Sequence, residues 1–542
     1  MRFLNTQTKS VSFASLILAG SYLLSAVLGI ARDRLLTGRF GLGNELDVYY
    51  SAFTVPDFIA LILILGAISA AIIPIFSSYV VHSKEEAWQY VSNLLTIFLT
   101  FLIGVCLVLI IFAPWLVHLI APGFSESKKE MTVVLMRIMF LSPIILGTSS
   151  IISGILQVFH RFLVTALAPI MYNLGIIIGI LFFVPWFGLP GLAFGVVLGG
   201  LLHLAIQLPA FFHSGFRYKF MFNLLHPGVR RTLNLTVPRS IGLGAGQFNT
   251  MVITAIASTL VAGSVAVYNL ANNLSSLLVN AVAVSLSTAI FPAMAQAFAR
   301  EDKSNFETKF VKAFLQLMFL SIPISIGIFL LRAQIVRVFY GTGKFTWLDT
   351  RLTAACLGIF CLGLFAQGLI FLLSKTFYAA HNTKIPALIS VATVAGNIIM
   401  SLLFIWLLNF TNIFSMLVRV VLKLQTVENI SVVGLSLAFT ITVICEALLL
   451  LFFIHKKLHI VKLVNILPSM YKILIAALVM VVIIWVTRDS LVRYHIINLQ
   501  TFLGVFIQLA AAGLLGSTGY LVTSFLLKSR ELHMIRETFL GK

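Results

Sequence analysis

Long runs of apolar residues recur along the whole chain, from the first thirty positions to the last forty. Each run is about as long as a helix that crosses the hydrocarbon layer of a bilayer. The runs are continuous and do not alternate in ten-residue segments, which disfavours a membrane β-barrel. The pattern predicts an all-α, polytopic membrane protein of about fourteen transmembrane helices, at residues 11–30, 50–76, 91–120, 131–158, 163–186, 189–213, 233–261, 265–298, 308–331, 351–378, 385–408, 431–454, 471–487 and 501–527.

Two stretches of the chain match each other at an offset of 218 residues. The matching positions are Ser69, Ala71, Ile72 and Pro74 in the second predicted helix and Ser287, Ala289, Ile290 and Pro292 in the eighth, with Tyr50 and Tyr268 in the same register. The displacement is six helices, an even number, so the two halves have the same orientation and form parallel repeats. We therefore predict two six-helix lobes, residues 1–215 and 216–460, around a central cavity, followed by two additional helices and a cytoplasmic tail in residues 461–542.

The composition agrees with a membrane protein, because 60% of the 542 residues are hydrophobic and only 10% are charged. In soluble proteins roughly a quarter of all residues are charged. A soluble multidomain enzyme, a disordered chain and a disulfide scaffold are therefore excluded. The four cysteines lie inside apolar segments without the spacing of a metal site, so we expect neither a metal nor a cofactor.

The net charge of +20 would suggest a nucleic-acid partner in a soluble protein. With the N-terminus inside, the predicted cytoplasmic segments hold 23 of the 37 Lys and Arg residues and the opposite side holds 13, while Arg137 lies within the fourth helix. Basic residues gather in cytoplasmic loops, beside an anionic leaflet. The distribution predicts that both termini are cytoplasmic, and it explains the charge by topology without a nucleic acid.

Ionisable residues at membrane depth are candidates for function, because a charge in hydrocarbon is costly unless it faces protein or water. Asp57 and Glu446 are the acidic residues well inside predicted helices, and the paired carboxylates or spaced histidines of an enzyme are missing. Glu446 is closest to mid-helix and is a candidate coupling group that titrates or pairs with an arginine. Asp57 is equally well explained as a loop-end group after Pro56, and Arg137 as a side chain that reaches the outer interface.

A cluster of charges follows the first predicted helix on the predicted outer side, with Arg32, Asp33 and Arg34 adjacent and Asp47 further on. Guanidinium groups bind phosphates by paired hydrogen bonds. Two interpretations stay open: the cluster contacts an anionic substrate, or it forms an interfacial ion-pair network such as Arg32 with Asp47.

Amide side chains recur in the second predicted lobe, Asn272 and Asn273 among them. They either satisfy one another between helices or form a neutral, polar cavity wall suited to sugar or peptide groups. The candidate substrate-binding residues are Arg32, Asp33, Arg34, Asp47, Arg137, Asn272 and Asn273.

Several short motifs are spread over almost the whole chain. They are Leu28-Gly29-Ile30-Ala31-Arg32-Asp33, Gly66-Ala67 leading to Pro74, Ala121-Pro122-Gly123-Phe124, Arg161-Phe162 with Ala168-Pro169 and Asn173, Gly263-Ser264-Val265, Gly343-Lys344-Phe345-Thr346, and Phe377-Tyr378-Ala379 with Thr383-Lys384 and Pro386. Together they resemble the MurJ/MviN family, the lipid II flippases of the multidrug/oligosaccharidyl-lipid/polysaccharide exporter superfamily.

The resemblance implies a flippase in the bacterial cytoplasmic membrane that takes the undecaprenyl-diphosphate-linked peptidoglycan precursor from the inner to the outer leaflet by alternating access. It implies two lobes around a cationic cavity and a groove for the lipid tail beside the last two helices. Its expected partners are the lipid-linked precursor, membrane lipids and cell-wall synthesis proteins. The transport cycle agrees with two lobes that rock about a central site.

The chain departs from the family at its cavity cations. Family members commonly place arginines in the first, second and eighth helices, where they are taken to bind the diphosphate. The matching positions here hold Ala26, Ala60 or Leu61, and Asn273. Arg32, with Asp33 and Asp47, keeps the family pattern, and Arg137 stands where the family has a basic residue in the fourth helix.

The coupling ion is a second departure. Some family members have a sodium site with an acidic residue in the seventh helix, and residues 249–254 contain no carboxylate here. Membrane potential or a proton on Glu446 is then the expected driving force. An exporter of another lipid-linked oligosaccharide and a non-transporting scaffold for cell-wall synthesis are the alternative functions.

Overall fold

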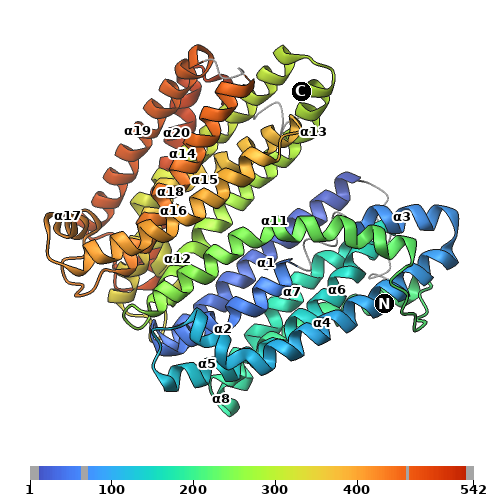
Figure 1. Cartoon of the computed structure of the whole chain (residues 1–542). Helices are drawn as coiled ribbons and strands as arrows, with labels where there is room; N and C mark the ends of the chain where they lie inside the picture. The colour runs from blue at the N-terminus through green and yellow to red at the C-terminus, as the bar shows by residue number, and fades with distance from the viewer. Residues whose placement is uncertain (1–10, 63–70, 459–462, 533–542) are drawn as a thin grey trace. The chain divides into compact units, whose positions relative to one another are not determined.

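The computed structural model describes residues 11–62, 71–458 and 463–532, which form helices joined by turns and loops (Figure 1). Within these ranges, 11 helices are long and apolar enough to cross a membrane. The prediction of an all-α, polytopic membrane protein is therefore confirmed. By their contacts, the residues form two compact units, Met1–Ala266 and Val267–Lys542.

The first unit contains the helices up to residue 266. Their bounds are α1 (Val11–Phe40), α2 (Asn44–Ala60), α3 (Ile73–His82), α4 (Lys84–Ile120), α5 (Glu126–Met139), α6 (Leu141–Val158), α7 (Phe162–Ile178), the π-helical turn η4 (Gly179–Phe183), α8 (Val184–Phe187), α9 (Pro190–Ala205), α10 (Leu208–His213) and α11 (Pro227–Ser258). Helix α12 (Ser264–Val279) starts in this unit and continues into the next.

The second unit contains the rest of the described chain. Its elements are the π-helical turn η5 (Asn280–Val284), α13 (Ser285–Ala299), α14 (Lys303–Tyr340), α15 (Trp347–Ala379), α16 (Lys384–Asn409), α17 (Ile413–Leu422), α18 (Val432–Leu458), α19 (Leu463–Arg493) and α20 (Phe502–Leu526).

Three of the fourteen predicted segments are outside the 11 long apolar helices. Residues 11–30 lie in α1, and residues 233–261 overlap α11, which contains a polar, glycine-rich stretch. The segment 50–76 runs from α2 to α3 and includes residues 63–70, which lie outside the described residues. Ser69 of the predicted repeat falls in this gap, and the terminal residues 1–10 and 533–542 also lie outside the described residues. The parallel repeat and the domain boundaries at 215 and 460 stay predictions. Helix α11, which follows residue 215, packs on α2, α3 and α4 of the first unit.

The core of the first unit is aromatic where α3, α4, α6 and α10 meet. Trp88 of α4 is half-buried and packs against this core, with ring centroids 5.5 Å from Phe76 and 5.5 Å from Phe216. Helix α4 is capped by Ser83, whose hydroxyl accepts a hydrogen bond from the backbone N–H of Glu86. This N-cap satisfies one of the free donors of the first turn.

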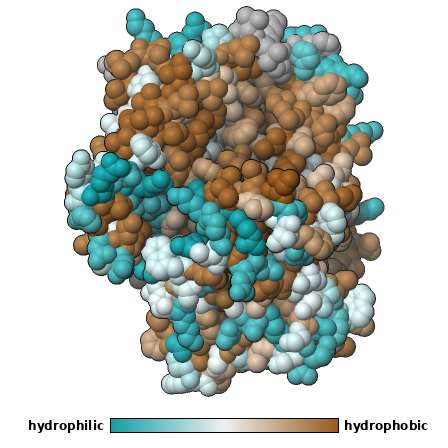
Figure 2. Space-filling model, turned by 90° about the vertical axis from the view of Figure 1, so that its left-hand side faces the viewer, coloured by the Kyte–Doolittle hydropathy of each residue, from teal (hydrophilic) through white to brown (hydrophobic). Residues whose placement is uncertain are grey.

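Apolar side chains also cover much of the outer surface. Figure 2 shows a broad area of hydrophobic residues on one face, with hydrophilic residues gathered in separate clusters around it. Exposed large side chains recur on α4, Val108, Phe112 and Trp115 among them. In water such a surface would be a liability, whereas in a bilayer it contacts lipid chains.

Helix α7 and the adjoining π-helical turn η4 pack on α9 through glycines. A Cβ atom added to Gly175 would lie 2.3 Å from the Cα of Gly199, and one added to Gly179 would lie 2.4 Å from the Cα of Gly195. Lipid tails are as apolar as leucine, so close backbone approach between small residues is a main source of helix association in membranes. The two glycine pairs therefore fix the distance between α7 and α9.

The second unit is organised around α15, which packs against α13, α14 and α18. Thr346 and Asp349 form a capping box at its first turn. Helices α19 and α20 pack on each other and on α14. The hydroxyl of Tyr520 in α20 donates a hydrogen bond of 2.9 Å to the backbone oxygen of Phe319 in α14, which joins this helix pair to the unit.

Helix α17 lies in a stretch that the sequence pattern leaves between two membrane segments. The side chain of Asn412 caps its first turn by accepting from the N–H of Ser415. Its outward side chains, among them Ile413, Leu417 and Val420, are exposed and apolar. A short amphipathic helix of this kind is typical of the membrane interface.

We predict that Gly175→Ala lowers the unfolding temperature of the purified protein, because its methyl group would overlap the backbone of Gly199. Overpacking of this kind costs about 1–3 kcal/mol. The matched control is Gly104→Ala in α4, where nothing lies within 4 Å of the added Cβ. Thermal unfolding in one detergent measures both variants, and equal unfolding temperatures would contradict the close contact.

Candidate functional site

Arg32 joins α1 to α7 in a polar cluster inside the first unit. Its Nε and Nη2 donate hydrogen bonds of 2.9 and 2.8 Å to Oδ1 of Asp33, and its Nη1 donates one of 3.2 Å to Oδ1 of Asn173. Asn173 in turn donates to the hydroxyl of Ser25 at 3.1 Å. Asp33 is buried, while 22% of the Arg32 side chain is exposed.

The bonding pattern leaves part of the Arg32 guanidinium available. Arginine has five N–H donors, and the cluster uses one on Nε, one on Nη1 and one on Nη2. One donor remains on each terminal nitrogen, the paired arrangement that matches two oxygens of a phosphate. Tyr49 and Tyr50 of α2 lie near Arg32, so three helices border the site.

Asp47 has a different role from Arg32. Its carboxylate accepts hydrogen bonds of 2.7 Å from the backbone N–H of Gly263 and 3.0 Å from that of Ala266, and Lys128 lies 3.4 Å from Oδ2. The two N–H groups belong to the first turn of α12 and the residue before it, which leave such donors free for an anion. Asp47 therefore anchors the start of α12 to α2, and no pair between Arg32 and Asp47 occurs among the described ion pairs.

Arg137 is exposed on α5, and its Nε donates a hydrogen bond of 3.1 Å to the backbone oxygen of Ile110 in α4. Pro114 lies four residues after Ile110 in the same helix. Proline has no N–H, so the carbonyl of the residue four positions earlier loses its helical partner. Arg137 supplies that missing donor, which is a structural contact between α4 and α5. Arg34 is half-buried on α1.

The remaining sequence candidates lie on separate helices. Asn272 and Asn273 are half-buried on α12, and Glu446 is half-buried on α18, so all three belong to the second unit. In the first unit, Nε2 of Gln247 in α11 donates a hydrogen bond of 3.4 Å to Oδ2 of Asp57 in α2. The first unit thus brings Arg32 and Asp33 together and places Asp47 and Arg137 in other contacts.

The second unit has an apolar groove of about 550 Å³ between α14, α15 and α19. Its walls include Ile326 and Phe329 of α14, Phe365 of α15 and Leu474 of α19. A groove between membrane helices that is lined in this way fits a hydrocarbon chain.

Two arginines stand beside this groove. Arg332 donates to the backbone oxygen of Phe329 at 2.7 Å, and Arg488 donates to that of Leu330 at 3.2 Å. From the sequence alone, Arg332 and Arg488 are only two of the 13 basic residues on the predicted outer side. Asn173 enters the sequence analysis only as part of a family motif. A lone amide in an apolar run is nevertheless a detectable signal of a polar contact between membrane helices.

The fold, with its long apolar helices and half-buried charges, defines a polytopic membrane protein. One solved structure with the same fold is an inward-facing multidrug resistance MATE family transporter of the MOP superfamily, with a TM-score of 0.65, 14% identity and coverage of 80% of this chain and 94% of that one. At this identity the likeness concerns the fold alone.

More specific matches identify the family. The family model described as "Lipid II flippase MurJ" matches residues 37–413. The chain is 30% identical over 71% of its length to a probable lipid II flippase MurJ of Rhizobium tropici, covering 74% of that protein. It is 28% identical over 94% of its length to one of Buchnera aphidicola, covering 96% of that protein.

A solved structure titled "Lipid II flippase MurJ, inward closed conformation" has a TM-score of 0.75 and 26% identity, and the match covers 94% of this chain and 98% of that one. The chain therefore belongs to the MurJ family of lipid II flippases, which are membrane transporters and not enzymes. The family resemblance that the motifs indicated is confirmed.

We predict that Asp47→Ala destabilises the protein, because the buried N–H groups of Gly263 and Ala266 would lose their acceptor. Each unsatisfied buried donor costs about 1–3 kcal/mol. Thermal unfolding measures the loss, with Glu45→Ala, an exposed acidic residue of the same helical turn, as the control. An Asp47→Ala protein as stable as the Glu45→Ala protein would refute the anchoring role.

Proposed function

We propose that this chain moves lipid II from the inner to the outer leaflet of the bacterial cytoplasmic membrane by alternating access, with both termini in the cytoplasm. The observation that carries the proposal is the match with a solved lipid II flippase over 94% of this chain. The excess of basic residues in the predicted cytoplasmic loops supports the orientation.

Arg32 is the proposed diphosphate contact. It is held by Asp33 and Asn173 in a fixed orientation and keeps one free donor on each terminal nitrogen. Charge-assisted hydrogen bonds are worth about 1.5–3 kcal/mol each. The positions of other family arginines hold uncharged residues in this chain, so the share of Arg32 in binding the diphosphate is correspondingly larger.

The groove between α14, α15 and α19 is the proposed site of the polyprenyl chain. The headgroup must leave water, whereas the hydrocarbon chain gains nothing by leaving the lipid, so the two parts need separate surroundings. An apolar groove of about 550 Å³ at the side of the second unit supports this division. Arg332 and Arg488 lie beside lining residues of this groove, through their bonds to the backbone of Phe329 and Leu330.

Glu446 is the proposed coupling group. It is half-buried on α18, and none of the ion pairs among the described residues includes it. A carboxylate at membrane depth is costly without such a partner, and protonation removes that cost. A proton taken up on one side and released on the other would couple transport to the proton gradient.

We predict that Arg32→Ala abolishes complementation of a flippase-depleted bacterium, because the paired phosphate contact is lost. Arg32→Lys keeps the charge beside Asp33 but lacks the planar fork, so it should restore growth only in part. Arg39→Ala, at the exposed end of the same helix, is the control. Normal growth of the Arg32→Ala strain would remove Arg32 from the substrate site.

The same strains separate the alternative functions. Lipid II exposure at the outer face, measured during complementation, should rise with the wild-type chain. Good membrane expression without exposure of any lipid-linked precursor would support the scaffold. Exposure of a different lipid-linked oligosaccharide, with lipid II retained inside, would support the other exporter.

We predict that Glu446→Gln slows proton-driven lipid II exposure at least tenfold, because the amide cannot release a proton. Glu428→Gln, an exposed carboxylate in the loop before α18, is the control. The measurement is the exposure rate in cells with and without a proton gradient. Unchanged exposure in the Glu446→Gln cells, still sensitive to membrane potential, would eliminate proton coupling through Glu446.

A further inference from the structure

The loop of residues 216–226, between α10 and α11, is bound along the side of α4. The side chain of Asn93 donates to the backbone oxygen of Asn223 and accepts from its N–H, both at 2.8 Å. The hydroxyls of Thr96 and Tyr218 are 2.8 Å apart, and Phe216 is buried against Trp88. These contacts hold the loop in one conformation on the helix.

The outer side of this loop is both apolar and basic. Phe220 is 77% exposed and Leu225 is 83% exposed. Arg217 and Lys219 in the loop, and Arg230 and Arg231 in the first turns of α11, are exposed as well. Aromatic side chains next to basic ones are typical of segments at the surface of an anionic leaflet.

The basic residues have few acidic neighbours. The sequence contains no Asp or Glu between Glu130 and Glu301. Glu86 at the start of α4 interacts electrostatically with His226, and none of the four basic side chains takes part in an ion pair among the described residues. Their charge is therefore available to an external anion.

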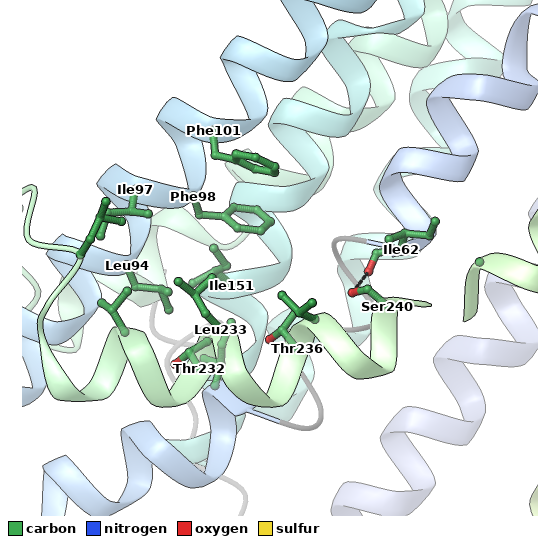
Figure 3. A pocket seen from close by; sticks show the side chains of 15 residues that line it. Ile62, Leu94, Ile97, Phe98, Phe101, Ile151, Thr232, Leu233, Thr236 and Ser240 are labelled. Carbon is green, nitrogen blue, oxygen red and sulfur yellow. Dashed lines mark hydrogen bonds between the residues drawn. The ribbon is translucent and has the colours of Figure 1, made fainter. Parts of the chain in front are cut away.

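An apolar cavity of about 540 Å³ begins beside this loop, between α4 and α11. Figure 3 shows Phe98 and Phe101 of α4 above Leu233 and Thr236 of α11. Its volume is in the roughly 300–1,000 Å³ range of pockets that hold small ligands. Phe101 is 55% exposed and lies on the same side of α4 as the exposed Val108 and Phe112, so the cavity opens toward lipid.

Two features of α11 connect the charged surface with the cavity. Arg230, Leu233 and Val237 are spaced i, i+3 and i+7 and share one face of the helix, and the latter two line the cavity. The hydroxyl of Thr236, which also lines it, is buried without a hydrogen-bond partner among the described residues. It lies about 8 Å along the helix axis from Arg231, at 1.5 Å per residue.

We propose that this place binds an anionic phospholipid of the membrane, with its phosphate at Arg230 and Arg231 and one acyl chain in the cavity. Arginine binds phosphate oxygens by paired hydrogen bonds, and the apolar cavity excludes a polar ligand. The depth of Thr236 below the arginines suits an acyl ester carbonyl, which would accept from the unpartnered hydroxyl. The site is formed within the first unit and does not depend on the proposed transport of lipid II.

Native mass spectrometry of the purified full-length protein, without lipid II, tests the site with phosphatidylglycerol and phosphatidylcholine as probes. The wild type should retain phosphatidylglycerol and bind phosphatidylcholine at least tenfold more weakly. The double variant Arg230→Gln/Arg231→Gln should lose this preference. The control Arg300→Gln/Lys303→Gln removes the same charge from two exposed residues, at the end of α13 and the start of α14 in the second unit, and should keep the preference.

A second pair of variants tests the cavity. Val237→Trp fills it and should reduce phosphatidylglycerol binding at least tenfold, while Val108→Trp, at an exposed position on α4 that does not line the cavity, should not. Inorganic phosphate should not displace the lipid. Equal retention of the two lipids, unchanged binding by the arginine double variant, or unchanged binding by Val237→Trp would each overturn the proposal.

Discussion

A charged group buried away from water has to find its partners in the protein, and the first unit depends on two buried carboxylates that do so. Asp33 holds Arg32, which in turn reaches Asn173 on α7. Asp47 holds the first turn of α12 through two backbone N–H groups. One carboxylate therefore presents a cation, and the other fixes the point where the chain leaves the first unit.

Packing between the helices depends on how closely their backbones approach. In water, burial of apolar side chains would drive this packing, but in a membrane these side chains are equally well placed against lipid. The glycine pairs that join α7 and η4 to α9 bring two backbones into contact, and large apolar residues on α4 stay exposed. The same condition explains why Arg137 completes the hydrogen bonding of α4 beside Pro114.

The sequence predicts the fold class well, because apolar runs of membrane length are a strong signal and the family motifs are numerous. It predicts the site less well. Adjacent charges at positions 32 and 33 do form a pair, but pattern cannot tell that Asp47 is engaged by the backbone of α12 or Arg137 by a carbonyl freed by a proline. Such contacts join residues that are far apart in sequence. Helix α17 was missed because ten residues are too few for a membrane span.

A flippase of this family with fewer cavity arginines should still carry a diphosphate lipid, since Arg32 keeps a fixed, partly exposed guanidinium. The most direct measurement uses liposomes that contain the purified protein and lipid II as the only glycolipid, and follows the appearance of lipid II in the opposite leaflet. We expect transfer well above that of protein-free liposomes. Transfer at the protein-free rate by folded, correctly inserted protein, under an imposed proton gradient and membrane potential, would contradict it.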